Sequence, residues 1–177
     1  SFTENTPYDS QNPYSASKAS SDHFVKAYVN THNLPAVITN CSNNFGPRQS
    51  SEKFIPKAIT NLLRGQKVTV YGEGREIRDW LYVQDHCEAL IEVWKKGAIG
   101  QNYNIGGGTE LNNLAVVSKI LSYMKKDYSD IKFVKNRPGH DFRYSIDCQK
   151  IEKDLGWKSR FNFDRALIET IEWYENR

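Results

Sequence analysis

Hydrophobic and polar positions along the chain follow two patterns, a helical period and short runs of β-branched residues. Apolar residues at helical spacing predict helices at 14–31, 52–64, 85–96, 114–125 and 163–174. Short apolar runs between them predict strands at 36–41, 68–71, 80–83, 103–105 and 131–134. Strands and helices that alternate in this way are typical of an α/β protein.

Polar residues mark where these elements begin and end. Asn12 followed by Pro13 predicts the start of the first helix, because asparagine caps the free N–H groups and proline suits the first turn. Asp85 is expected to cap the helix at 85–96 in the same way. Residues 42–51 are rich in Ser, Asn, Gly and Pro, and we expect a loop there, with the boundary between two sub-domains close by.

Composition and charge restrict the function more than the fold. The 24 basic and 21 acidic residues of this 177-residue chain are mixed along it, giving a net charge of +3, so nucleic acid is not an expected partner. Cys41, Cys87 and Cys148 lack the spacing of a zinc site or a disulfide framework, and we expect no metal. Free thiols and the lack of a long apolar run favour a cytoplasmic protein that does not span a membrane.

Tyr14 and Lys18 are four residues apart near the start of the first predicted helix, so both project from one face. A phenol is a poor base at neutral pH because its ordinary pKa is about 10. An ammonium group close by stabilises the phenolate and allows it to accept a proton from an alcohol. A tyrosine and a lysine at this spacing also occur often by chance, so the pair alone does not establish catalysis.

The sequence around this pair adds specificity. The tract PYSASKA at 13–19 is followed by CSNNFGP at 41–47, EKFIP at 52–56 and YGEGREIRDWLYV at 71–83. Further blocks are YNIGG at 103–107, RPGHD at 137–141, LGW at 155–157 and EWY at 172–174. Together they resemble the extended short-chain dehydrogenases/reductases that act on nucleotide sugars, in family order over the whole chain.

Three of these blocks are most similar to the dTDP-glucose 4,6-dehydratases. They are the doubled asparagine at 43–44, the tract at 52–56 and the histidine of RPGHD. Phe54 stands where leucine is more usual, and Asn136 where an aspartate is expected before RPGH. An epimerase or decarboxylase of the same superfamily, or a nucleotide-sugar-binding remnant without activity, remains as an alternative.

The resemblance implies a reaction that uses bound NAD⁺. Tyr14 would deprotonate the glucose 4-hydroxyl as hydride leaves C4, water would be lost across C5 and C6, and hydride would return at C6. Lys18 would assist Tyr14 and hydrogen-bond the nicotinamide ribose, and Asn44 would also contact the cofactor. His23, His32 and His86 lack acidic or thiol partners at ligand spacing, and we interpret them as structural.

The resemblance also implies a site for the nucleotide sugar, dTDP-glucose. Lys53 and Arg78 would bind the diphosphate, since charge-assisted hydrogen bonds are the strongest available to it. We expect these two cations to converge on one anion pocket, with Arg137 and His140 nearby. Either cation alone would more often be a solvated surface charge. The complete set of expected substrate contacts is Asn43, Lys53, Phe54, Thr69, Val70, Tyr71, Arg78, Asn113, Arg137 and His140.

By the same resemblance, residues 1–45 would be the end of an NAD-binding Rossmann domain. Residues 46–177 would form mainly a smaller α/β nucleotide-sugar-binding lobe, with the strand at 102–106 returning to the Rossmann sheet. The glycine-rich cofactor turn and an Asp–Glu pair for the elimination would precede Ser1, because no G-x-G-x-x-G occurs here. We interpret the glycines at 106–108 as a turn. We therefore expect an inactive isolated chain, and a homodimer of the intact protein through the helix at 14–31.

Overall fold

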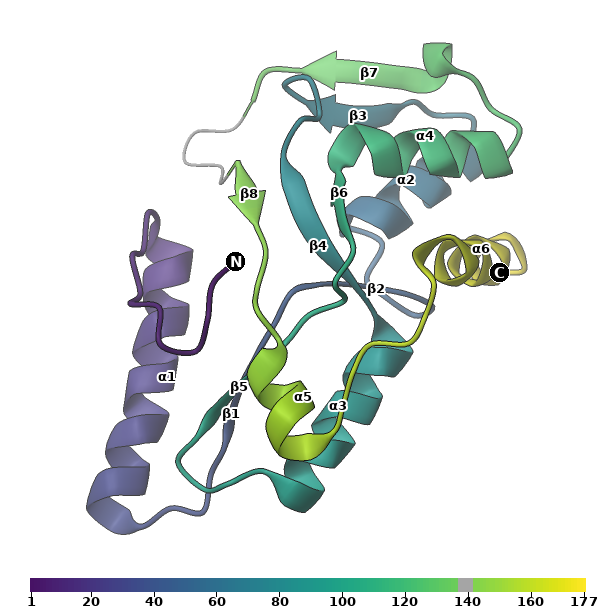
Figure 1. Cartoon of the computed structure of the whole chain (residues 1–177). Helices are drawn as coiled ribbons and strands as arrows, with labels where there is room; N and C mark the ends of the chain where they lie inside the picture. The colour runs from purple at the N-terminus through teal and green to yellow at the C-terminus, as the bar shows by residue number, and fades with distance from the viewer. Residues whose placement is uncertain (137–141) are drawn as a thin grey trace.

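The computed structural model describes residues 1–136 and 142–177 and is an α/β protein (Figure 1). Its helices are α1 (Pro13–His32), α2 (Phe54–Leu63), α3 (Val83–Lys96), α4 (Asn113–Tyr123), α5 (Gln149–Leu155) and α6 (Phe163–Glu175), with a 3₁₀ turn at Tyr128–Asp130. Its strands are β1 (Ile38–Cys41), β2 (Asn43–Phe45), β3 (Val68–Tyr71), β4 (Ile77–Tyr82), β5 (Asn102–Ile105), β6 (Glu110–Asn112), β7 (Ile131–Val134) and β8 (Arg143–Tyr144). The predicted α/β class is confirmed.

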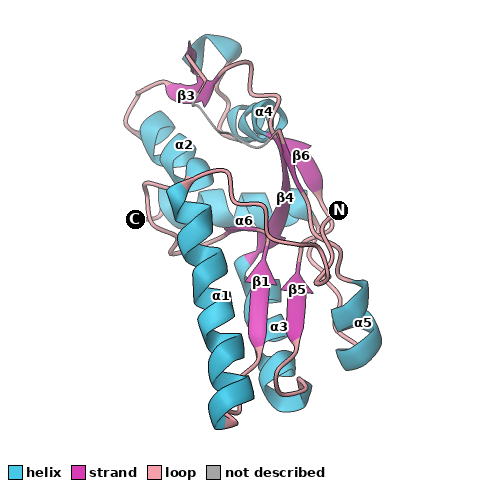
Figure 2. Ribbon diagram, turned by 90° about the vertical axis from the view of Figure 1, so that its left-hand side faces the viewer, coloured by secondary structure: helices cyan, strands magenta, loops and turns pink. Residues whose placement is uncertain are grey.

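One part of the molecule is built on the parallel pair β1–β5. Ile38 lies opposite Asn102, and the register continues to Cys41 opposite Ile105. The helices α1 and α3 lie on opposite sides of this pair, as two perpendicular views show (Figures 1 and 2). The strand expected to return from the lobe thus pairs with β1, while the division of the chain near residue 45 stays a prediction.

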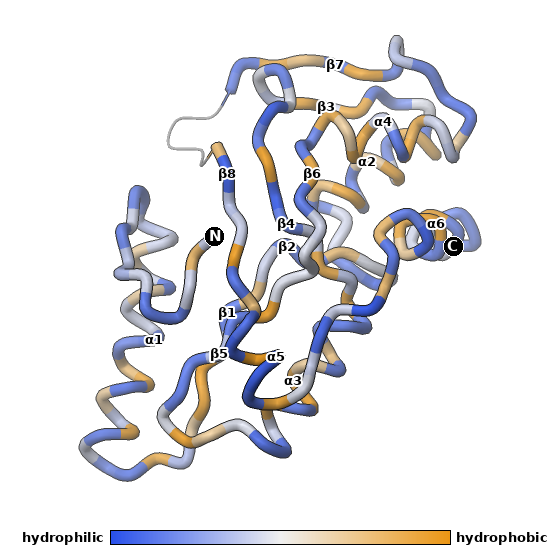
Figure 3. Tube along the Cα trace, viewed as in Figure 1, coloured by the Kyte–Doolittle hydropathy of each residue, from blue (hydrophilic) through white to orange (hydrophobic). Residues whose placement is uncertain are grey.

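The other part, which we call the lobe, contains the larger hydrophobic core. In its main sheet β4 lies between β2, which is parallel to it, and β6, which is antiparallel, and β8 also pairs with β4. A second parallel pair, β3–β7, extends the lobe. Helices α2, α4 and α6 supply most of the buried apolar residues, including Ile55, Ile59, Leu62, Val116, Ile120, Leu167 and Ile171. Hydrophobic colour accordingly follows α2, whereas α1 is largely hydrophilic (Figure 3).

The expected loop at 42–51 was wrong in part, because β2 lies inside it and pairs with β4. The extended piece at 80–83 is also longer than predicted and begins at Ile77. Both β2 and β6 have only three residues, mostly polar, so their apolar pattern gives no strand signal. Such strands form because a neighbouring strand offers hydrogen bonds, and sequence periodicity does not record the neighbour.

Asp85 is not the N-cap of α3. The helix begins at Val83, with Tyr82 in the capping position. The Asp85 side chain is fully buried, and its Oδ2 accepts hydrogen bonds from the Ser159 hydroxyl (2.6 Å) and from the backbone N–H of Arg160 (3.0 Å) and Phe161 (3.1 Å). It therefore ties α3 to the segment that leads into α6.

The first helix begins as predicted, since Asn12 accepts a hydrogen bond from the Ser15 N–H (2.9 Å) and Pro13 follows it. Of the helix's 20 residues, none is buried. The Asp22 carboxylate attaches α1 to its surroundings by accepting from the Tyr8 hydroxyl (2.6 Å) and the Asn40 side-chain amide (2.9 Å) through one oxygen. Within the described ranges, no helix has both the length and the apolar character needed to cross a membrane.

Candidate functional site

Tyr14 and Lys18 lie one helical turn apart near the N-terminal end of α1, and both are exposed. Tyr14 is exposed to 75% of its full surface. Burial raises the pKa of the Cys41 thiol, and the nearby Lys18 ammonium opposes that rise. Asp22, one turn further along α1, accepts from the Asn40 side-chain amide (2.9 Å), so the helix lies against β1 near its carboxyl end, which is where α/β proteins bind ligands.

Asn44 lies just beyond this strand end, and its side chain is held from two directions. Its amide nitrogen donates to Cys41 Sγ (3.3 Å) and to the Ser42 carbonyl oxygen (3.2 Å). Its amide oxygen lies 2.8 Å from Nδ1 of His86 on α3. The sequence interpretation took His86 as structural, because it has no acidic or thiol partner at ligand spacing. Its contact with Asn44 spans 42 residues, so no local spacing shows it.

A second group of expected site residues surrounds Trp80 on β4. Asn43 is the register partner of Trp80, and the Phe54 ring stacks on the indole with centroids 6.1 Å apart. Arg78 is two residues before Trp80 on the same strand, so the two side chains project from the same face. Arg78 is half-buried, and its Nη1 donates to the Ile77 carbonyl oxygen (2.8 Å).

A third group lies at the turn between β3 and β4. The Gly74 N–H donates to the Tyr71 carbonyl oxygen (3.0 Å), and the Asn113 N–H donates to the Glu76 carbonyl oxygen (3.1 Å). Tyr71 and Asn113 are therefore both anchored to this one turn. The buried Glu76 carboxylate also accepts from the side-chain amide of Asn136 (2.7 Å).

Thr69 and Val70, two expected ligand contacts beside this turn, differ in how deeply they are buried. Thr69 is half-buried on β3, so its side chain is partly accessible. Val70 is fully buried in the hydrophobic core. The contact of Thr69 and Val70 with the nucleotide base stays a prediction.

Lys53 precedes α2, is exposed and forms a weak surface pair with Glu52, with the charged atoms 3.5 Å apart. Arg137 and His140 lie outside the described residues. The structure places Arg78 on β4 and Lys53 at the start of α2, beside Phe54. A shared anion pocket of these four side chains stays a prediction.

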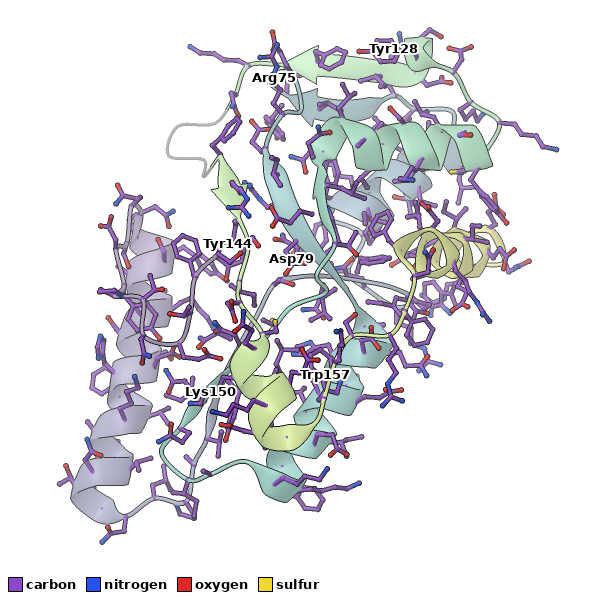
Figure 4. All side chains as sticks on the ribbon, in the orientation of Figure 1. Arg75, Asp79, Tyr128, Tyr144, Lys150 and Trp157 are labelled. Carbon is purple, nitrogen blue, oxygen red and sulfur yellow. The ribbon has the colours of Figure 1, made fainter. Side chains whose placement is uncertain are left out.

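Asp79 is a buried acid that the sequence interpretation passed over. It lies near the middle of the molecule (Figure 4), and its Oδ1 accepts from the Thr109 N–H (3.1 Å). Burial raises the pKa of this carboxyl group. The glycine run at 106–108 packs here as well, since a Cβ on Gly107 would lie 1.8 Å from the Trp80 carbonyl oxygen. Close packing therefore explains Gly106 and Gly107, whereas Gly108 has open space around it and a φ of +66°, a conformation that favours glycine.

A hollow of about 480 Å³ opens beside Asn44, lined by residues 44–49 and 82–84. Most of its exposed lining is apolar, which suits the flat face of an aromatic ring. The expected contact of Asn44 with the cofactor stays a prediction. The glycine-rich fingerprint that binds the pyrophosphate of NAD⁺ does not occur in these 177 residues.

The fold and the Tyr14–Lys18 helix define a Rossmann-like protein of the nucleotide-sugar dehydratase and epimerase class. The family described as GDP-mannose 4,6 dehydratase matches residues 1–170. The chain belongs to this family.

Individual relatives agree with that assignment. The dTDP-glucose 4,6-dehydratase of Escherichia coli is 50% identical over 99% of this chain and 51% of its own length. A crystal structure of dTDP-glucose 4,6-dehydratase from Streptomyces venezuelae with NAD and TYD bound has a TM-score of 0.97 at 42% identity, covering 99% of this chain and 55% of the other. The resemblance read from the sequence is confirmed.

A UDP-glucuronic acid 4-epimerase from Bacillus cereus shares the fold, with a TM-score of 0.93 at 24% identity, covering 98% of this chain and 55% of the epimerase chain. At that identity the likeness concerns the fold alone. The chain spans about half the length of the curated relatives that it matches.

Proposed function

We propose that these residues are part of a dTDP-glucose 4,6-dehydratase that converts dTDP-glucose to dTDP-4-keto-6-deoxyglucose and water. The observation that carries the proposal is the pairing of a Tyr14–Lys18 helix with the carboxyl end of β1, in a chain 50% identical to such an enzyme. NAD⁺, when bound, supplies the hydride acceptor and later the hydride donor. The proton transfer and the elimination of water depend on side chains of the protein.

Tyr14 takes the proton of the sugar 4-hydroxyl, and its exposure leaves the phenol oxygen accessible to a substrate. Lys18 stabilises the phenolate through its positive charge. Asn44 and the adjacent hollow receive the nicotinamide end of the cofactor. Neither the glycine-rich cradle nor an Asp–Glu pair for the elimination has been identified in these 177 residues. We therefore expect no turnover by this chain alone.

Asn43, Phe54 and Arg78 around Trp80 receive the sugar diphosphate, with Lys53, Arg137 and His140 completing the anion site. Several donors must converge there, because a desolvated diphosphate without partners is too costly. Thr69, Tyr71 and Asn113 face the nucleotide base and ribose, and the buried Val70 holds this stretch of β3 in the core. The β3–β4 turn would thus recognise the nucleoside part of the substrate.

The decisive experiment is turnover of dTDP-glucose by the intact gene product, followed by mass spectrometry. A dehydratase yields a product lighter by one water, and an epimerase a product of unchanged mass. A decarboxylase would leave dTDP-glucose unchanged, because this sugar has no carboxylate, and would release carbon dioxide only from a nucleotide-linked uronic acid. A protein that binds the nucleotide sugar without changing its mass or configuration would be the inactive remnant. Only the loss of water supports the proposal.

Tyr14→Phe should lower turnover by about 10²- to 10⁴-fold, the usual contribution of a general base. Tyr28→Phe is the matched control, because Tyr28 lies on the same helix and is also exposed. Turnover by the isolated 177-residue chain with added NAD⁺ would contradict our view of the cofactor cradle. Equal losses for both tyrosine variants would contradict the catalytic role of Tyr14.

Assembly and location complete the proposal. The exposed aromatic side chains Phe24 and Tyr28 make α1 a candidate face for a homodimer of the intact protein. Sedimentation of the intact protein as a monomer at micromolar concentration would contradict it. Free thiols at Cys41, Cys87 and Cys148 favour the reducing cytoplasm.

A further inference from the structure

The Asn44 side chain has one orientation that satisfies all its neighbours. Its two amide hydrogens point to Cys41 Sγ and the Ser42 carbonyl oxygen, which are both acceptors. The amide oxygen is therefore the atom that faces His86, at 2.8 Å from Nδ1. An oxygen can only accept a hydrogen bond, so Nδ1 of His86 must carry the proton.

This assignment selects one tautomer of His86. Burial lowers the pKa of the imidazole, so the ring is neutral near pH 7 and carries a single proton. With that proton on Nδ1, the Nε2 atom is unprotonated and can only accept. The ring acts as a fixed donor on α3, aimed at the end of β1.

These contacts decide which hydrogen-bonding groups the Asn44 side chain can still offer to a ligand. Both of its N–H groups are used within the protein, and one lone pair of its oxygen is used by His86. The remaining lone pair can accept a hydrogen bond from a ligand, but the residue has no donor left to offer. The same contacts fix the turn from Cys41 to Asn44, at the carboxyl end of β1.

We propose that His86 is a positioning residue, whose Nδ1–H holds Asn44 so that the site presents a hydrogen-bond acceptor to the nicotinamide end of the cofactor. The part that concerns the cofactor rests on the proposed function. The part that concerns the hydrogen bond rests on the geometry alone. The two parts need separate measurements.

The hydrogen bond is tested on the 177-residue chain by nitrogen NMR of ¹⁵N-labelled histidine at pH 8. The His86 resonances should show a protonated Nδ1 and an unprotonated Nε2. Asn44→Ala should abolish that preference, whereas His23 and His32, both exposed on α1, should not change. A proton on Nε2 of His86 in the parent chain would overturn the proposal.

The effect on the cofactor is tested in the intact protein by measuring the NAD⁺ dissociation constant. His86→Asn keeps a donor at the position of Nδ1, His86→Gln moves the donor one bond outward, and His86→Leu removes it. The Gln and Leu variants should bind NAD⁺ about tenfold more weakly, and the Asn variant should stay close to the parent. Thermal unfolding of each variant accounts for any general loss of stability.

Two results would overturn the positioning role. One is an unchanged NAD⁺ dissociation constant in all three variants. The other is an Asn variant that binds as weakly as the Leu variant, because a purely structural histidine would give that result. The intact protein could show the expected order of NAD⁺ affinities among the three variants and still not dehydrate dTDP-glucose. That result would contradict the proposed function and would support the role of His86.

Discussion

The helices α1 and α2 show how differently the two parts of this molecule are held together. In α2, Ile55, Ala58, Ile59 and Leu62 are buried against α4, α6 and the lobe sheets. In α1 no residue is buried, and the Phe24 and Tyr28 side chains lie open. The lobe is thus stabilised by apolar packing, and α1 by a few hydrogen bonds that join it to Tyr8 and Asn40.

This difference matters because the two parts carry different halves of the chemistry. The acid–base pair Tyr14–Lys18 is on the weakly packed helix, while the expected diphosphate contacts Phe54 and Arg78 are on lobe elements. Elements with few buried contacts open locally at low free energy. We therefore expect the proton-transfer side of the site to be the more labile in this chain.

The largest expected effect is on the lobe core. Ile59→Ala should lower the free energy of unfolding by about 2–5 kcal/mol, because it leaves a cavity at a fully buried position. Phe24→Ala on α1 should change it by no more than about 0.5 kcal/mol, as is usual for exposed sites. Urea unfolding followed by circular dichroism measures both. Comparable losses in the two variants would show that α1 is covered in solution.

A smaller and local effect is expected at Asp22. Asp22→Ala removes the acceptor of two hydrogen bonds, so the free energy for opening α1 should fall by about 1–3 kcal/mol. Hydrogen exchange should show faster exchange of the α1 amides and unchanged exchange in α2 and α4. Ser21→Ala, at the exposed neighbouring position, is the control. Faster exchange throughout the lobe would remove the distinction between the two parts.

The smallest effect concerns a polar contact within the lobe. Asn136→Asp should cost about 1–2 kcal/mol, because it sets a second carboxylate against the buried Glu76. Adding Glu76→Gln should restore most of the loss, since an amide and a carboxylate then face each other again. A double-mutant cycle in urea measures the coupling. Additive losses would mean that the pair does not interact in solution.

Much of the fold could be predicted from the sequence, because its main elements have clear periodicity. The strand at 68–71 and the strand at 131–134 were placed at their observed bounds. The helices at 14–31 and 163–174 were each within a residue of the structure. The short strands β2, β6 and β8 were missed, because pairing partners far along the chain determine them. The helix α5 was also missed, because its seven residues are too few for a clear helical period.

The site, like the fold, could be predicted only where local sequence determines it. The proximity of Tyr14 and Lys18 follows from the helical repeat, so it could be read from the sequence. The pairs Asn44–His86 and Glu76–Asn136 depend on tertiary packing across 42 and 60 residues, and no local pattern encodes them. The asparagine that replaces an expected aspartate at 136 is explained by its contact with the Glu76 carboxylate.

The order of strands also bears on how the chain folds. Cys41 pairs with Ile105, so the stretch from β2 to α3 lies between two adjacent strands as one closed excursion, and the rest of the lobe follows β5. Closing a loop of that length by chance carries an entropic cost that grows with the logarithm of its length. A lobe that is already compact brings Ala36 and Gly100, which are hydrogen-bonded in the folded chain (2.8 Å), close together beforehand. Formation of the β1–β5 pair is therefore expected to follow collapse of the excursion between the two strands.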